Sequence, residues 1–379
     1  MEPMQDMMPE SYAKLPADEL ARRVAARKRE LGDALVILGH HYQSDAVIQF
    51  ADFTGDSLKL SQLAAAQTAA RYIVFCGVHF MAESADVLSS PEQAVILPTL
   101  SAGCAMADMA EAPDVELALN ELRAMTDARI VPVTYVNSTA AIKAITARAG
   151  GACCTSSNVR NVFEWAFRPQ AEGGAGAGKI LAIPDRHLAM NTAEAMGYAP
   201  DDWAIWNPHE PDGGLTRPQV ARAKFLLWLG QCYVHQLFTP AHVEAIRRQD
   251  PAVRVIVHPE CPREVVHLAD ASGSTEQIIR AVAAAAPGSK WAVGTESNLV
   301  NRLAKQHPDQ SIRVLSNAAA LCVQMARIDL PHLLWVLDNL ADGRVVNRVR
   351  VDAAEAADAR VALQRMIDIK AVRDATDRR

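Results

Sequence analysis

The stretch 34-ALVILGHHY-42 joins a continuous apolar run to a cluster of polar side chains, and 57-SLKLSQLAAAQTAA-70 follows it. The apolar run predicts a buried strand, whereas the second stretch has the apolar spacing of a helix. A strand that is apolar throughout, followed by a helix, is typical of parallel α/β layers. The polar residues that end the strand would then lie at the carboxyl edge of the sheet, where such folds bind ligands.

The same order of residue types occurs three times, and each copy ends in a cysteine. The copies run from Ala34–Leu38 through His40 and Ser57 to Cys104, from Ile130–Val136 through Asn137 and Ser156 to Cys232, and from Val253–Val257 through His258 and Ser274 to Cys322. The serine follows the strand-end residue by 17, 19 and 16 residues, and the cysteine follows the serine by 47, 76 and 48. This repeat predicts three similar α/β units. If they face one centre, three thiolates would meet there and leave a fourth metal position open.

Further apolar runs between helical patterns support an α/β class with small parallel sheets. They are 72-YIVF, 94-AVIL, 179-KILAI and 291-WAV. We therefore expect three similar three-layer domains, over residues 1–110, 111–235 and 236–340. The second is the longest, and we interpret 171–178 and 198–216 within it as surface insertions; the latter could instead be a lid or a subunit contact. The C-terminal segment 341–379 is expected to pack back on the first domain.

The composition limits the classes of partner that the protein can bind and the cellular compartment in which we expect it. The net charge is −6 and no run of five basic residues occurs, so nucleic-acid binding has little electrostatic support. Seven scattered cysteines favour a reducing cytoplasm over a secreted disulfide framework. No apolar run approaches the ~18–20 residues of a membrane span. The first 20 residues lack the basic and apolar regions of a signal peptide.

Cys104, Cys232 and Cys322 lie in loop-like contexts just before helical patterns, and their repetition makes them the candidate metal ligands. Three thiolates favour an iron-rich centre, and a [4Fe–4S] cluster held by three cysteines keeps one iron open as a Lewis acid. A zinc site with three cysteines is the alternative, although local zinc spacing is absent. The other four cysteines suit other roles: Cys76 in a strand-like run, the adjacent Cys153 and Cys154 on opposite strand faces, and Cys261 beside Glu260.

Ser57, Ser156, Ser274 and Thr275 each stand where a helix is expected to begin. Their simplest role is to cap the helix N-terminus. The same positions can bind anions, because helix N-termini present N–H groups and a positive dipole end. Three such termini together would favour a small polyanion that carries phosphate and carboxylates.

Further candidates follow the strands directly. His40 and His258 occupy matching strand ends, with Asn137 as their counterpart in the second copy. Glu260 is a candidate general base, although it could simply pair with a nearby arginine such as Arg263. Tyr42 and Tyr135 could bind substrate or donate protons, or could pack at the strand ends.

These residues coincide with a family pattern, and the chain resembles quinolinate synthase over nearly its whole length. The likeness is carried by 39-GHHYQ, 50-FADFTGDSLKLS, 77-GVHFMAESA, 98-PTLSAGCAMADM, 135-YVNSTAAIKA, 153-CCTSSN, 184-PDRHLAMNT, 232-CYVHQLFT, 257-VHPEC, 273-GSTEQII, 294-GTESNLVNRL and 322-CVQM. Their number, order and spacing make the match specific.

The resemblance implies three α/β domains about a pseudo-threefold axis, with one [4Fe–4S] cluster per chain at their central junction. It assigns the cluster to Cys104, Cys232 and Cys322. It assigns catalysis to Glu260, Tyr42, Tyr135 and His258. The substrate-binding set it implies is His40, Ser57, Asn137, Ser156, His235, His258, Glu260, Ser274 and Thr275; His235 enters only through the family motif.

The family's reaction condenses iminoaspartate with dihydroxyacetone phosphate to form quinolinate, with release of phosphate and two waters, in de novo NAD biosynthesis. The resemblance therefore implies a cytoplasmic transferase that condenses and dehydrates small anions, with possible transient contact with an aspartate oxidase or dehydrogenase. Two alternatives stay open. One is another iron–sulfur hydro-lyase that acts on a small hydroxy acid, and the other is a non-catalytic iron–sulfur sensor of a metabolite.

Overall fold

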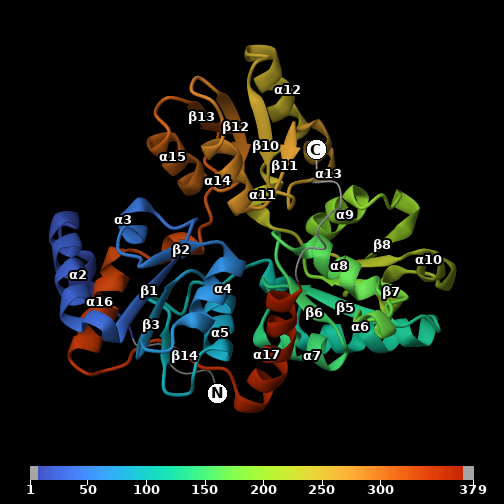
Figure 1. Cartoon of the computed structure of the whole chain (residues 1–379), viewed down its shortest axis with the longest axis horizontal. Helices are drawn as coiled ribbons and strands as arrows, with labels where there is room; N and C mark the ends of the chain where they lie inside the picture. The colour runs from blue at the N-terminus through green and yellow to red at the C-terminus, as the bar shows by residue number, and fades with distance from the viewer. Residues whose placement is uncertain (1–6, 370–379) are drawn as a thin grey trace. The chain divides into compact units, whose positions relative to one another are not determined.

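Three small β-sheets flanked by helices make up the fold in a computed structural model that describes residues 7–369 (Figure 1). The predicted α/β class with small, largely parallel sheets is thereby confirmed. By its internal contacts the chain divides into two compact units. The first comprises Met1–Cys104, Ala241–Ile256 and Ile278–Asp352, and the second comprises Ala105–Pro240, Val257–Gln277 and Ala353–Arg379. The three domain boundaries and the pseudo-threefold arrangement stay predictions.

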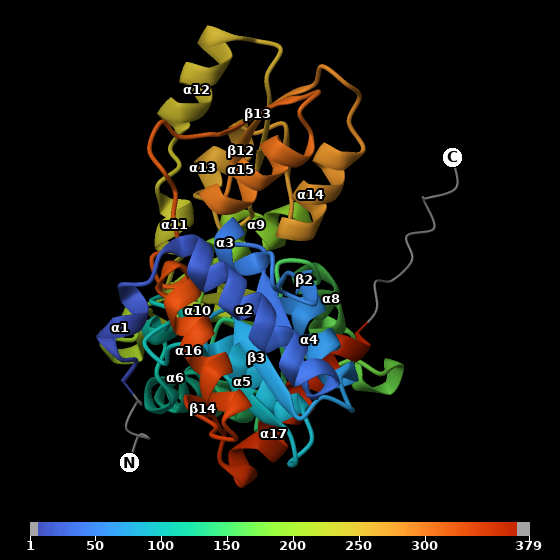
Figure 2. The same ribbon diagram turned by 90° about the vertical axis from the view of Figure 1, so that its left-hand side faces the viewer.

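The first sheet has the strand order β14-β4-β3-β1-β2, and only β14 runs antiparallel to its neighbour. Every residue of β1 and β3 is buried, as their continuous apolar sequences predict. The strands are β1 (Leu35–His40), β2 (Phe53–Gly55), β3 (Tyr72–Cys76), β4 (Ala94–Ile96) and β14 (Arg348–Val349). Helices α2 (Ala17–Leu31) and α16 (Leu330–Ala341) lie side by side in this region (Figures 1 and 2). Its other helices are α1 (Glu10–Ala13), α3 (Asp45–Ile48), α4 (Ser57–Ala66) and α5 (His79–Leu88).

The second sheet is wholly parallel, in the order β6-β5-β7-β9-β8. Its apolar core includes Trp228 of β9 and the inward faces of α6 and α7. The strands are β5 (Ile130–Tyr135), β6 (Ala152–Cys154), β7 (Lys179–Ile183), β8 (Trp203–Trp206) and β9 (Phe225–Trp228). The helices are α6 (Ala112–Met125), α7 (Ala140–Arg148), α8 (Val159–Phe167), α9 (Arg186–Ala195), α10 (Arg217–Arg222) and α11 (Tyr233–Gln236).

The third sheet has the order β11-β10-β12-β13, with β12 and β13 parallel. Its strands are β10 (Arg254–Val257), β11 (Ala271–Ser272), β12 (Lys290–Gly294) and β13 (Ser311–Val314). The accompanying helices are α12 (Pro240–Gln249), α13 (Arg263–Leu268), α14 (Thr275–Ala283) and α15 (Ser297–Gln306). Short 3-10 helices occur along the described chain at Gly32–Ala34, Ala107–Met109, Gln170–Glu172, Pro200–Asp202, Pro211–Gly214 and Met325–Arg327.

The C-terminal segment is shared between the two units. Strand β14 pairs with β4 of the first sheet, as expected. Helix α17 (Ala353–Asp368) instead packs on α7, and Asn158 Nδ2 donates a hydrogen bond to the carbonyl of Met366 over 3.0 Å. The expectation that all of 341–379 packs on the first domain is therefore wrong for α17, whose buried stripe of Ala359, Ala362, Leu363 and Met366 matches the second unit. Residues 370–379 lie outside the described residues.

The structure of the segment 198–216 also contradicts the interpretation of this segment as a surface insertion. It contributes β8, the fifth strand of the second sheet, and Trp206 at the end of β8 is only 1% exposed. Gly213 has a φ of +63°, and a Cβ atom there would lie 2.3 Å from the Trp206 ring. The Pro, Asp and Gly residues therefore shape a turn that folds over a core tryptophan. The other insertion, 171–178, includes a buried residue, Ala175, whose N–H bonds the carbonyl of Trp165 over 3.1 Å.

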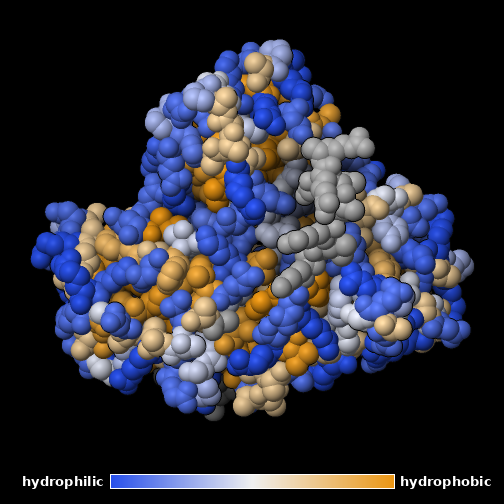
Figure 3. All heavy atoms as spheres, viewed as in Figure 1, coloured by the Kyte–Doolittle hydropathy of each residue, from blue (hydrophilic) through white to orange (hydrophobic). Residues whose placement is uncertain are grey.

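Among residues 7–369, no helix is both long and apolar enough to span a bilayer. On the face shown in Figure 3, hydrophilic and hydrophobic residues are interspersed.

Candidate active site

Glu260 is the centre of a buried polar cluster in the second unit. It follows β10 and is only 3% exposed. Its Oε1 accepts a hydrogen bond of 2.6 Å from the Tyr135 hydroxyl at the end of β5. Its Oε2 lies 2.8 Å from Nδ1 of His235, which belongs to α11. Arg263 pairs instead with Glu194, over 2.6 Å, so the alternative role that we considered for Glu260 does not apply.

His258 completes this cluster. Its ring stacks on that of His235, with centroids 4.5 Å apart and an interplanar angle of 16°. Burial lowers the pKa of His258 to about 3, so the ring is neutral near pH 7. Burial by itself raises the pKa of Glu260, but the neighbouring histidines and the Tyr135 hydrogen bond outweigh burial and lower that pKa to about 2. Glu260 is therefore a buried carboxylate that the Tyr135 hydroxyl and His235 contact directly.

The hydrogen bonds also define which ring nitrogen carries the hydrogen. The backbone N–H of Glu260 points to Nδ1 of His258 over 3.3 Å, and the N–H of Tyr42 points to Nδ1 of His40 over 3.1 Å. A nitrogen that accepts cannot carry the hydrogen in the neutral ring, so Nε2 is the donor in both histidines. Matching strand-end histidines thus present the same donor atom.

Cys232 is the N-cap residue of α11 and lies beside this cluster. Ligand atoms of Cys232, His235 and Glu260 all lie within 4.8 Å of one another, a spacing that could hold a metal ion. The backbone N–H of Cys232 donates over 3.1 Å to Oδ2 of Asp185, the N-cap residue of α9. Burial and the Glu260 charge raise the pKa of Asp185 well above its usual range.

The first unit holds a second group of predicted residues. His40 ends β1 and is buried, and its ring meets that of Tyr42 edge-on at 4.7 Å. The Tyr42 hydroxyl lies 2.9 Å from Oγ1 of Thr295, and the Tyr42 carbonyl accepts from Asn298 Nδ2 over 3.1 Å. These contacts fix the loop after β1 on the N-terminal end of α15.

Glu296 occupies the same end of α15 and touches the Cys322 loop. Its Oε2 accepts the backbone N–H of Asn298 over 2.8 Å, and its Oε1 faces the N–H of Cys322 over 3.4 Å. Burial raises the pKa of Glu296 to about 7.

The seven cysteines, all within the described residues, fall into two classes. Cys104, Cys232 and Cys322 are partly exposed, whereas the other four are buried. Burial raises the pKa of Cys76 and Cys153 to about 12, and it raises the pKa values of Cys154 and Cys261 well above the usual range. Because metal ligands must be thiolates, only the partly exposed set suits ligation. The donor chemistry therefore fits the predicted set.

The three serines that were predicted to open helices, Ser57, Ser156 and Ser274, do not all act as helix caps. Ser57 is the first residue of α4, but Asp56 caps that helix by accepting from Lys59 N over 2.9 Å. Ser156 does not open α8, because the helix begins at Val159 after the turn that contains it. Ser274 does cap α14: its Oγ accepts from the Gln277 N–H over 3.4 Å, and its own N–H donates to Gln277 Oε1 over 2.7 Å.

The Ser274 hydroxyl accepts from the Ser157 hydroxyl over 2.9 Å, which brings together the turns before α8 and α14, and Thr275 is buried next to it. Asn137, after β5, has a buried Oδ1 that makes no hydrogen bond to the described residues. An orphaned acceptor of this kind is costly unless a ligand or water satisfies it, which suits a binding role.

The structure thus brings together Tyr135, Cys232, His235, His258 and Glu260 in one unit, and His40 with Tyr42 in the other. Thr295 and Glu296 were missing from the predicted set. The same signal could have found them, since each follows a buried apolar strand within one or two residues.

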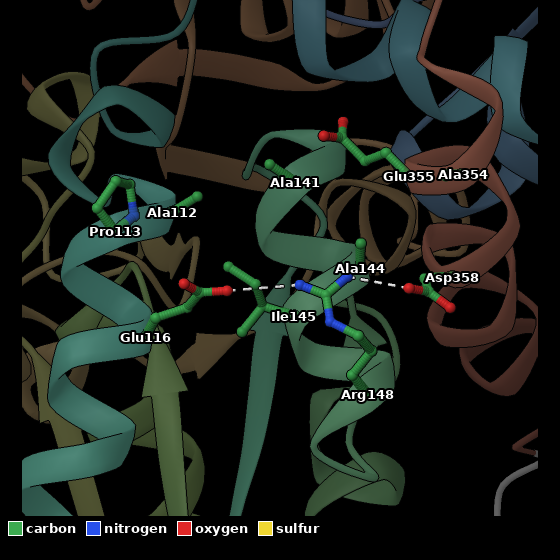
Figure 4. Close-up of a pocket in the computed structure, with 10 residues that line it drawn as sticks. All are labelled: Ala112, Pro113, Glu116, Ala141, Ala144, Ile145, Arg148, Ala354, Glu355 and Asp358. Carbon is green, nitrogen blue, oxygen red and sulfur yellow. Dashed lines mark hydrogen bonds and ion pairs between the residues drawn. The ribbon is translucent and has the colours of Figure 1, made fainter.

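A separate pocket of about 290 Å³ lies between α6, α7 and α17 (Figure 4). Arg148 reaches across it, 2.9 Å from Asp358 and 3.5 Å from Glu116. It contains none of the predicted site residues, and its arginine is already neutralised by carboxylates.

A buried acid–base cluster whose residues follow the strands of an α/β fold is typical of an enzyme active site. Comparison with known proteins narrows this class. The family model described as "Quinolinate synthetase A protein" matches residues 22–368. The chain belongs to the quinolinate synthase family of enzymes.

Individual relatives agree with the family match. A quinolinate synthase from a Nocardioides species is 53% identical over 350 residues, which cover 92% of this chain and 89% of the relative. One from Anoxybacillus flavithermus is 51% identical over 368 residues, which cover 96% of each chain. One from a Geobacillus species is 50% identical over 362 residues, again 96% of each.

Proposed function

We propose that this protein makes quinolinate from iminoaspartate and dihydroxyacetone phosphate, with release of phosphate and two waters, as a step of de novo NAD biosynthesis. The buried cluster of Tyr135, His235, His258 and Glu260 carries the proposal, because the reaction needs proton transfers at a site shielded from water. Family membership and relatives named quinolinate synthase at about half identity support the same activity.

We propose Cys104, Cys232 and Cys322 as the ligands of one [4Fe–4S] cluster. Their partial exposure, in contrast to the burial of the other four cysteines, supports the assignment. When bound, such a cluster supplies an open, Lewis-acidic iron for a substrate hydroxyl.

The side chains divide the remaining work. His40 and His258 offer Nε2–H donors to the phosphate and carboxylate groups of the substrates. Asn137 offers its orphaned Oδ1 to a substrate N–H or O–H group. The N-terminal end of α14, with Ser274 and Thr275, offers backbone donors to an anion, and Ser57 and Ser156 stand at or before comparable helix ends.

Glu260 is proposed to move the protons. As a carboxylate at neutral pH it can accept a proton from a substrate carbon or nitrogen, and His235 beside it orients Oε2. Tyr135 can return a proton from its hydroxyl, which already lies in a short hydrogen bond with Glu260. Tyr42, held by Thr295, is the second hydroxyl donor.

A mononuclear metal ion on Cys232, His235 and Glu260 is the second candidate, because their ligand atoms lie within 4.8 Å of one another. The 2.8 Å contact between His235 and Glu260 argues against it, since the ion would have to replace that hydrogen bond. The identity of the bound metal distinguishes the [4Fe–4S] cluster from the mononuclear site.

The test is iron, sulfide and zinc analysis of protein purified without oxygen, followed by a quinolinate assay with dihydroxyacetone phosphate and freshly generated iminoaspartate. We expect about four irons per chain and quinolinate. Iron without quinolinate would favour another hydro-lyase or a sensor. Zinc, or no metal after anaerobic reconstitution, would overturn the cluster assignment. Contact with an aspartate oxidase or dehydrogenase, and a cytoplasmic location, stay predictions.

A further inference from the structure

The three cysteine loops share one backbone contact that the sequence repeat does not reveal. In each, the carbonyl two residues before the cysteine accepts the N–H of the first residue of a helix in the same unit. The pairs are His79 with Ala102 at 2.8 Å, Arg186 with Gly230 at 3.0 Å, and Ser297 with Ala320 at 2.9 Å. The first backbone N–H of each of the helices α5, α9 and α15 therefore binds one cysteine loop, at the carbonyl oxygen two residues before the cysteine.

Two of these helices add a side-chain contact to the cysteine itself. The N-cap residue of α9 is Asp185 and that of α15 is Glu296, both buried. Each carboxylate uses one oxygen for its own helix: Asp185 Oδ1 accepts from Leu188 N over 2.7 Å, and Glu296 Oε2 accepts from Asn298 N over 2.8 Å. The corresponding residue before α5 is Val78, which has no carboxylate.

The second oxygen of each carboxylate faces the backbone N–H of the cysteine. Asp185 Oδ2 lies 3.1 Å from Cys232 N, and Glu296 Oε1 lies 3.4 Å from Cys322 N. Both oxygens of a carboxyl group can accept, whereas an amide presents one acceptor and one NH₂ group. Only the acid can therefore bind the helix N-terminus and the cysteine together.

We propose that Asp185 and Glu296 are positioning residues that fix Cys232 and Cys322 for metal binding. The inference rests on the proposed role of these cysteines as cluster ligands. The carboxylates act through the ligand backbone, and they lower the entropic cost of ordering each loop.

The test uses the cluster-loaded, full-length enzyme and measures iron release to a chelator without oxygen. The variants are Asp185→Asn and Glu296→Gln, which keep side-chain shape and remove one acceptor. Asp329→Asn is the control: Asp329 caps α16 by accepting from His332 N over 3.0 Å. The thermal midpoint of each variant reports any general loss of stability.

We expect Asp185→Asn and Glu296→Gln to release iron about 10- to 100-fold faster than wild type, while the control releases it at the wild-type rate. Wild-type release rates in both variants would overturn the inference and leave the proposed function intact. If Asp185→Asn does not fold, Glu296→Gln in the other unit decides the question. A wild-type chain that takes up no cluster would overturn the proposed function, and the inference with it.

Discussion

The hydroxyl of Tyr135 lies 2.6 Å from Oε1 of Glu260, although the two residues are 125 positions apart in the chain. This contact joins the end of β5 to the loop after β10 and places a proton donor on a buried carboxylate. The sequence already marks Glu260 as a candidate general base, and this contact supplies a proton donor beside it.

Glu260→Gln should keep the metal centre and lose most quinolinate formation. The amide keeps the shape of the side chain but cannot accept a proton, so we expect a fall in kcat of about 10²- to 10⁴-fold. Iron content and quinolinate yield measure the two effects. Glu264→Gln, at an exposed position of α13, is the control and should resemble wild type. Near-wild-type turnover of Glu260→Gln would remove Glu260 as the acid–base group.

Cys104→Ala, Cys232→Ala and Cys322→Ala should each abolish correct assembly of a cluster. Three cysteines provide all the protein ligands in this proposal, so no spare thiolate replaces a missing one. Iron and sulfide analysis after anaerobic reconstitution checks this. Cys153→Ala removes a buried thiol and should retain the wild-type iron content. A fully loaded, active Cys232→Ala variant would contradict the ligand assignment.

Protonation of Glu194 in acid should destabilise the second unit. Its hydrogen bond with Arg263 outweighs the opposing effect of burial and, together with His267, lowers the pKa of Glu194 to about 2 from 4.5. Because folding lowers this pKa, the contribution to stability is complete above about 4.5 and disappears as the pH falls through about 2.

Urea unfolding of Glu194→Gln measures this contribution. We expect a loss of about 1–2 kcal/mol in the free energy of unfolding at pH 7, and no difference from wild type near the lower pKa. Glu164→Gln, which breaks a helix-surface pair with Arg160 at 3.0 Å, should cost less than about 0.5 kcal/mol. An equal effect of the two variants would contradict the prediction.

Trp206→Ala should destabilise the protein by about 3–5 kcal/mol, because it empties a space in the core of the second sheet. Gly213→Ala should also be destabilising, since its added Cβ atom would meet the Trp206 ring and its φ is positive. Chemical denaturation measures both. Trp203→Ala, at a partly exposed position of the same strand, should cost less. A small effect at Trp206 would favour the lid interpretation of 198–216.

Much of the fold could be read from the apolar runs. Seven runs that the sequence marks as strands, among them 130-IVPVTYV and 253-VRVIV, overlap β1, β3, β4, β5, β7, β10 and β12. They are visible because a strand covered on both faces must be apolar throughout. Strand β8 was not visible in the sequence, because its polar, Pro- and Gly-rich surroundings resemble a surface loop.

The site was predicted in part. His258 and Glu260 follow a strand and could be found by that rule, whereas His235 came only from the family motif. The partners of α17 could not be predicted, because an amphipathic helix specifies an apolar stripe but not the surface that covers it.

The sequence by itself determined the α/β class, the three cysteine-ending repeats and the family, since these depend on local pattern and on residue order. Tertiary structure alone decided which carboxylate each donor meets: Glu260 with Tyr135 and His235, Glu194 with Arg263, Asp185 with the N–H of Cys232. The physical reason is that hydrogen bonds act over about 3 Å, and residues far apart in the chain reach that distance only after the sheets and helices have packed.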